Sequence, residues 1–159
     1  GSEMCIRDSS PCFALMVGLS PEVQLSFDAA LVKNSSIKWI AVNSTKTGRS
    51  MHKALVVHSC NSWAHDNLEG ELSHIQDQLV GELAAVTGLS AGDFNHIDIA
   101  RWRYAKVSEA APQELYLNAS LRIAACGDWC LGNRVEDAFL SAIGLSKKLV
   151  EEFSGSSIT

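Results

Sequence analysis

The sequence lacks the features that would identify an exported, membrane-spanning or nucleic-acid-binding protein. No apolar run reaches the roughly 18–20 residues that span a bilayer, so we expect no membrane partner. The first ten residues have no basic end, apolar centre or small-residue cleavage site of a signal peptide, which predicts a cytoplasmic protein. The 13 lysines and arginines are scattered and the net charge is −5, which argues against a nucleic-acid partner.

The cysteines also lack a recognisable pattern. Their number, five, is odd, and their spacings fit no disulfide framework, so reduced thiols are the simpler interpretation. Cys126 and Cys130 have three residues between them, whereas a thioredoxin-type pair has two. No second cysteine pair or histidine follows at ligand spacing, so we expect no metal site.

A sizeable apolar fraction, 47% of 159 residues, is enough to build a folded core. Apolar residues at spacings of three and four from Leu68 to Val86 predict an amphipathic helix that ends near Gly88. A second such stripe predicts a long helix over Val135–Phe153. Short apolar or alternating runs predict strands over 13–19, 27–32, 37–45, 54–60, 96–105 and 121–127. The fold class is therefore α+β, with a mixed, mainly antiparallel sheet and a packed helix, then a short strand and the long helix.

The stretch CGDWCLGNRVEDAFLSA, residues 126–142, carries the main functional signal. An apolar strand ends at Gly127-Asp128, and a loop through Gly132 leads to the helix that begins near Val135. A strand, a glycine turn and a helix start place free backbone N–H groups and a positive dipole end at one spot, which suits an anionic or carbonyl-rich ligand. Asp128 would then accept hydrogen bonds from ligand hydroxyls. The alternative is a plain turn in which Asp128 caps the backbone.

This stretch resembles the C-terminal flavin-binding motif of FAD-dependent amine-oxidase-like proteins. It is most similar to the renalase-like NAD(P)/FAD-dependent oxidoreductases. IARWRYAKV (99–107) resembles that family's Trp-Arg-Tyr strand, and PCFALMVGL, SIKWIAVNSTKTGRS and ALVVHSCNSWAHDNLE resemble segments of its substrate domain. The ordered set covers about Pro11 to Phe153. The resemblance implies an FAD-dependent enzyme that oxidises a small amine or a reduced nicotinamide-like substrate by hydride transfer to the flavin.

The resemblance also implies roles for individual residues. Trp63 and Trp102 would line the substrate cavity, although both could equally be core aromatics. No catalytic acid or base is assigned, and His58, in an apolar strand, is interpreted as a hydrogen-bonded structural residue. The residues implied to bind the cofactor are Gly127, Asp128, Trp129, Arg134, Val135, Glu136 and Ala138.

One family feature is missing, because the sequence contains no Gly-x-Gly-x-x-Gly dinucleotide fingerprint. We therefore interpret the chain as a fragment, expected to be inactive and to purify without FAD. The alternative is a non-catalytic binding or interaction domain that binds no flavin. The expected organisation is an artefactual or cloning-derived leader (1–10), a substrate-domain-like region (11–120), the FAD-binding strand, turn and helix (121–153) and a tail (154–159).

Truncation would leave apolar surface bare. We expect self-association through Leu121–Cys126 and Val135–Phe153, because an unpaired strand and an exposed apolar stripe favour association. The alternative is that the helix folds back on its own antiparallel sheet and hides the stripe.

Overall fold

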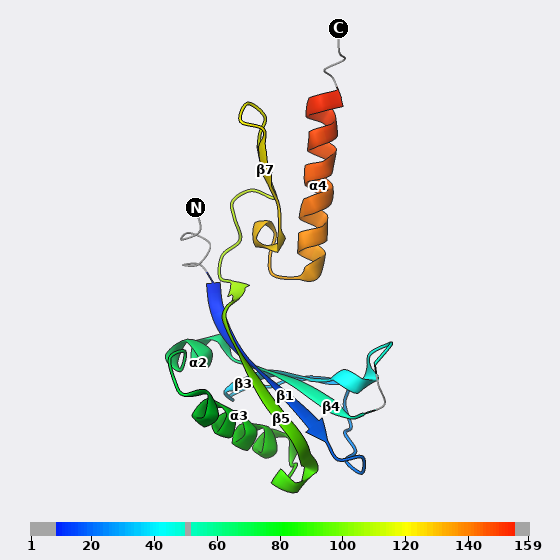
Figure 1. Ribbon diagram of the computed structural model, residues 1–159, viewed down its shortest axis with the longest axis vertical. Coiled ribbons are helices and arrows are strands. Elements are labelled where there is room, and N and C mark those ends of the chain that lie inside the picture. The colour runs from blue at the N-terminus through cyan, green and yellow to red at the C-terminus, as the bar shows by residue number, and fades with distance from the viewer. Residues whose placement is uncertain (1–8, 50–51, 155–159) are drawn as a thin grey trace. The chain divides into compact units, whose positions relative to one another are not determined.

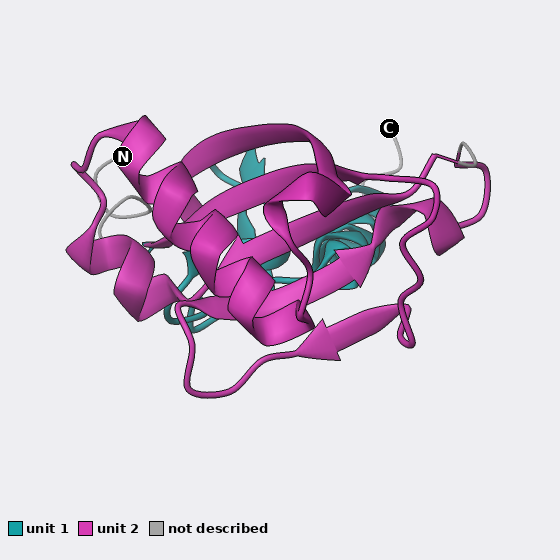
Figure 2. Ribbon diagram, turned by 90° about the horizontal axis from the view of Figure 1, so that it is seen from below, with its two compact units in different colours: residues 1–9, 106–159 teal, residues 10–105 magenta. Residues whose placement is uncertain are grey.

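The computed structural model describes residues 9–49 and 52–154, which form two compact units. One unit is Ser10–Ala105, and the other contains the chain from Lys106 onward (Figure 2). The expected division after residue 120 lies later than this one. The reason is a strand that we did not predict, β6 (Tyr116–Asn118), which pairs with β7 (Ile123–Ala125) and so belongs with the C-terminal segment.

The first unit is built on a five-stranded antiparallel sheet in the order β2-β3-β4-β1-β5 (Figure 1). Three neighbouring strands, β2 to β4, form the expected meander. The first strand then lies between β4 and β5, an arrangement that spacing alone could not predict. The strands are β1 (Ser9–Leu19), β2 (Ala29–Leu31), β3 (Ile37–Val42), β4 (Ala54–Ser59) and β5 (Phe94–Val107).

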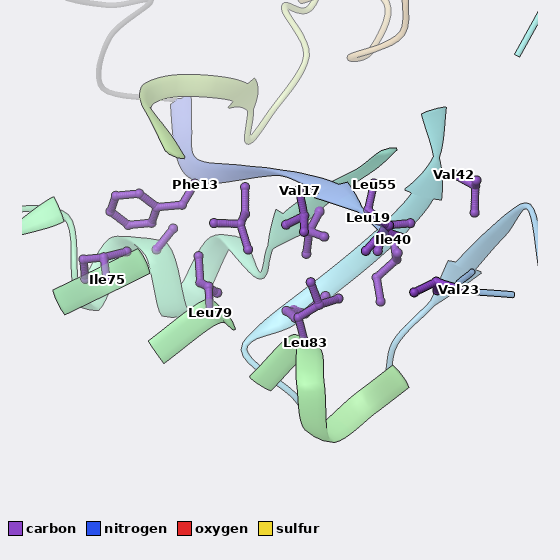
Figure 3. Close-up of a cluster of buried hydrophobic side chains, with 14 residues drawn as sticks. Phe13, Val17, Leu19, Val23, Ile40, Val42, Leu55, Ile75, Leu79 and Leu83 are labelled. Carbon is purple, nitrogen blue, oxygen red and sulfur yellow. The ribbon is translucent and has the colours of Figure 1, made fainter. Parts of the chain in front are cut away.

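Two helices follow β4. The short α2 (Asn61–Asp66) leads into α3 (Leu72–Thr87), which ends where Gly88 adopts a left-handed conformation with φ 75°. The helix predicted from Leu68 therefore begins one turn later. Figure 3 shows the side chains of Ile75, Leu79 and Leu83 on α3 directed at the strands, and all three are buried. With strand residues such as Phe13, Leu15 and Val57 they form the hydrophobic core.

Among the described residues of this unit, no helix covers the opposite face of the sheet (Figure 1). Strand alternation places residues that are not in the core on this face, and the register makes His58 the direct neighbour of both Ala14 and Trp39. On β5, Arg101 lies over the Phe13 ring on the core side, so Trp102 falls on the open face. Trp102 is 58% exposed.

The C-terminal unit consists of the β6–β7 hairpin, a single 3₁₀ turn (Asp128–Cys130) and α4 (Val135–Ser154). The hairpin closes near Arg122, a non-glycine residue with φ 52°. The long helix coincides with its predicted range, and the short strand before it is present but limited to three residues. The α+β prediction is confirmed. Among the described residues, the helices are too short or too polar for any of them to cross a membrane.

Candidate functional site

The loop between β7 and α4 is held by two glycines and one serine. A Cβ on Gly127 would lie 2.5 Å from Nε1 of Trp129, so only glycine lets the indole lie this close to the backbone. The Gly127 N–H donates to Oγ of Ser141 at 3.2 Å, and this hydroxyl donates to the Glu114 carbonyl at 2.6 Å. Ser141 is buried, so it ties the loop, the hairpin and the helix together.

Asp128 is the first residue of the 3₁₀ turn. Its backbone carbonyl is hydrogen-bonded, whereas its side chain makes no hydrogen bond to a described residue. Its carbonyl accepts the N–H groups of Leu131 and Gly132 at 3.0 and 2.7 Å. The residue is exposed, and within the described part of the chain its carboxylate has no hydrogen-bond or ionic partner. The interpretation of Asp128 as a backbone cap is therefore not supported, because its side chain caps nothing in this turn.

A different carboxylate, that of Asp137, caps the entrance to α4. Its Oδ2 accepts the backbone N–H groups of Asn133 and Arg134, both at 3.0 Å, and the Arg134 guanidinium reaches Oδ1 at 3.1 Å. These hydrogen bonds, with that from the Arg134 side chain foremost, lower the pKa of Asp137 below its usual value. Gly132 permits this fold-back, since a Cβ there would lie 2.5 Å from Oδ2. Sequence reasoning missed Asp137, although an aspartate in the first turn of a helix is a typical capping residue.

The capping leaves two backbone donors at the helix start. Asp137 and Ala138 donate to the Arg134 carbonyl, and Asn133 and Arg134 donate to Asp137. Among the described residues, nothing accepts from the N–H groups of Val135 and Glu136. These donors and the free Asp128 carboxylate belong to one short segment, so the loop offers both acceptors and donors to a ligand. The charge of Arg134 is already balanced by Asp137 and by Glu136 at 3.6 Å.

The two loop cysteines, Cys126 and Cys130, belong to no metal-binding cluster of described residues. Cys126 is half-buried and Cys130 is buried, and both are free, as are Cys12 and Cys60. Across the described ranges, His, Cys, Asp and Glu side chains nowhere gather in the groups of three that would hold a metal ion. Cys5 lies outside the described residues. Burial raises the pKa of the Cys12 thiol, which disfavours the reactive thiolate.

The two predicted substrate residues lie on opposite faces of the sheet. Trp63, on α2, packs edge-on against Phe13 with ring centroids 5.9 Å apart, which is the core-aromatic alternative. Its exposed part borders a shallow groove beside α3 that is rich in amide and hydroxyl groups, from residues such as Asn34, Ser62 and Gln78. Trp102 lies on the open face instead. The structure therefore does not bring Trp63 and Trp102 together in one cavity.

The open face carries two residues that sequence reasoning had not placed there. Trp39 lies beside His58, and His58 is exposed with no hydrogen-bond partner in the described part of the chain. The prediction that His58 is a hydrogen-bonded structural residue is therefore wrong, because alternation along β4 turns its side chain away from the core. Partial burial, with the nearby charge of Lys46, lowers its pKa.

Two arginines of β5, Arg101 and Arg103, are engaged in contacts within the fold. Arg103 makes a bidentate salt bridge with the Glu69 carboxylate, with N–O distances of 2.5 and 2.9 Å. This salt bridge raises the pKa of Arg103 and lowers the pKa of Glu69. Arg101 donates to the Gly70 carbonyl and lies 5.7 Å from the Phe13 ring centroid. Its buried Nε finds no acceptor among the described residues. These arginines hold β5 against the segment before α3 and are not a free anionic-ligand site.

No family model matches this chain. The likeness to renalase-like oxidoreductases therefore rests on the quoted motifs and on the geometry of the loop, and it remains a proposal.

Proposed function

We propose that this chain is part of an FAD-dependent oxidoreductase of the amine-oxidase and renalase-like type. The observation that carries the proposal is the loop before α4, where a free Asp128 carboxylate and the unpaired N–H groups of Val135 and Glu136 share one short segment of the described chain. A flavin cofactor offers the complementary groups, with ribityl hydroxyls as donors and pyrimidine carbonyls as acceptors. The residues present therefore fit the group.

In this proposal each residue has a limited role. Asp128 would accept hydrogen bonds from the ribityl chain, and the N–H groups of Val135 and Glu136 would face the pyrimidine edge. When bound, FAD would accept hydride from a small amine or a reduced nicotinamide-like substrate. The N-terminal end of α4 would favour the negative charge that reduction places on that edge. Asp137 holds the helix start in this geometry and takes no part in binding.

Of the two tryptophans expected to contact the substrate, Trp102 is the better candidate, because its side chain is exposed on the open face of the sheet. Trp63 would then act as a core residue on the other side. We place the protein in the cytoplasm, where thiols such as Cys126 and Cys130 stay reduced.

The proposal is tested on a longer open reading frame, obtained by extending the gene upstream of the Pro11 codon. We expect the longer protein to purify with yellow flavin and Asp128→Ala to weaken FAD retention. Losing a charge-assisted hydrogen bond costs about 1.5–3 kcal/mol, or about one to two decades in affinity. Asp77→Ala, which removes an exposed carboxylate from α3, is the matched control and should leave FAD binding unchanged. A colourless extended protein that binds no added FAD would refute the proposal.

The second candidate is a binding or interaction domain that uses no flavin. The absence of a Gly-x-Gly-x-x-Gly fingerprint in this sequence favours it. The two candidates separate on the same extended reading frame, because a flavoprotein requires the fingerprint upstream and a flavin-free domain does not. For the present chain alone, both candidates predict purification without FAD.

A further inference from the structure

The helix α4 buries two small polar residues of its first half and exposes most of its large apolar residues. Its buried residues are Asp137 and Ser141, which face the loop and the hairpin of the same unit. Several of its large apolar side chains are exposed to solvent. The exposed fraction is 91% for Val135, 64% for Phe139 and 46% for Phe153. Burying apolar surface is the main favourable contribution to folding, and within the described residues of its own unit this helix has no partner for its apolar side.

Five of the six large apolar residues exposed on α4 share one side of the helix, which we call the α4 stripe. At about 100° per residue, they fall within roughly a quarter turn of the helix circumference. The stripe borders a shallow groove along the C-terminal half of the helix, lined by residues that include Ala142, Leu149 and Val150. The five large members of the stripe are Val135, Phe139, Ile143, Val150 and Phe153.

We propose that the α4 stripe is covered by the α4 stripe of a second copy of this chain, with the two helices antiparallel. A twofold axis that crosses the stripe at the level of Gly144 along the helix would bring Phe139 of one copy against Val150 of the other. It would likewise bring Val135 against Phe153. At the axis the small residues Ala142 and Ser146 would meet and let the helices approach closely. The stripe is therefore complementary to itself in the isologous manner that a twofold dimer requires.

The exposed area is sufficient for a specific but weak dimer. The five large side chains are between 37% and 91% exposed, which together equals about three whole side chains. At roughly 150–200 Å² each, one copy contributes at most about 500 Å² and the dimer buries at most about 1,000 Å². This area is at the lower limit for a specific interface, so we expect dissociation in the micromolar range.

The hairpin exposes Leu121 and Ile123 as well, at 65% and 53%. These residues lie on the β6–β7 hairpin and not on the α4 stripe, so the proposed interface does not depend on them. The expectation that Leu121–Cys126 takes part in association is a separate prediction, and variants at these two positions test it in the same assay.

Sedimentation equilibrium of the full chain over a wide concentration range tests the proposal. We expect a monomer–dimer equilibrium that Phe139→Lys or Val150→Glu alone weakens by at least about tenfold. The variant with both changes should recover dimerisation, because the antiparallel arrangement brings the introduced lysine of one copy beside the introduced glutamate of the other. A parallel pair would bring like charges together and would give no recovery.

Leu140→Lys is the matched control. Leu140 is 47% exposed and large, but it lies about 100° round the helix from Phe139, so its change should leave the dimer intact. A monomer at tens of micromolar would overturn the proposal and would mean that the stripe is covered within one chain. A dimer that ignores both stripe variants would overturn it equally. No outcome depends on flavin, so this test is independent of the proposed function.

Discussion

The helices α3 and α4 have the same sequence signature and opposite outcomes. Each carries apolar residues at spacings of three and four, and each begins and ends close to its predicted range. In α3 the apolar residues Ile75, Leu79 and Leu83 are buried against the sheet, whereas in α4 the residues Phe139 and Ile143 remain exposed. Amphipathic spacing therefore predicts that a helix needs a partner, but it does not identify the partner.

The two units differ for a physical reason. The sheet and the helices α2 and α3 enclose a core that keeps water from residues such as Phe13 and Val57. The described part of the C-terminal unit has a hairpin of three-residue strands, a 3₁₀ turn and one helix. Its buried apolar residues are Leu115 and Cys130, and Ser141 and Asp137 hydrogen-bond the loop to the helix. Two short strands do not make an independently stable sheet in water. The second unit therefore has a much smaller apolar core than the first and depends more on hydrogen bonds.

The largest expected effect comes from shortening a leucine side chain in each of the two helices and comparing the loss of stability. Leu79→Ala removes a fully buried side chain from the core and should lower the free energy of unfolding by about 2–5 kcal/mol. Leu140→Ala removes the same atoms from an exposed position on α4 and should change it by less than about 0.5 kcal/mol. Urea denaturation followed by circular dichroism measures both. Equal losses would show that the α4 surface is buried in solution.

A smaller effect is expected in the C-terminal unit at Ser141. Ser141→Ala leaves the Gly127 N–H and the Glu114 carbonyl without their common partner. Such unsatisfied groups cost about 1–3 kcal/mol when water cannot reach them. Hydrogen exchange at Gly127 should therefore accelerate, while exchange in β1 stays unchanged. Unaltered exchange at Gly127 would contradict the role assigned to this hydroxyl.

Much of the fold was predictable because strand and helix periods are local properties of the sequence. The α+β class and the range of α4 were predicted in this way, and so was the strand over 13–19, although β1 begins earlier, at Ser9. The position of β1 between β4 and β5 was not, because strand order depends on contacts between residues far apart in the chain. The strand Tyr116–Asn118 was missed because three residues are too few for a period to be recognised.

The candidate site was predictable to a lesser degree. The glycine turn and the helix start are where the motif places them, and the role of Asp128 in ligand binding stays a prediction. The capping role of Asp137 was missed because the Gly-Asp pair is the more conspicuous motif. The opposite placement of Trp63 and Trp102 depends on sheet faces. One faces the core from a helix and the other alternates outward along β5, a difference that spacing alone does not reveal.

The third prediction concerns pH and the C-terminal unit. The pKa of Asp137 is lowered by its bonds to Arg134, so folding is favoured by the ionised carboxylate. This contribution is complete above the unfolded value of about 3.9 and is lost as pH falls through the lower folded value. We expect the amide resonances of Asn133 and Arg134 to move together with that titration. In Asp137→Asn the acid-dependent change should disappear, and its persistence would mean that another carboxylate is responsible.

The smallest expected effect concerns the open face of the first unit. Partial burial between Ala14 and Trp39, with the charge of Lys46, lowers the pKa of His58. The unfolded chain therefore binds the proton first, and stability declines as pH falls below about 6.5 until the folded histidine also titrates. A nuclear magnetic resonance titration should give His58 a midpoint below that value, and Lys46→Gln should move the midpoint upward. Trp39→Ala, which exposes the ring to water, should move it upward as well, because desolvation is the larger cause. If neither variant changes the midpoint, His58 is fully solvated. Its neighbours on the open face then do not shield it from water.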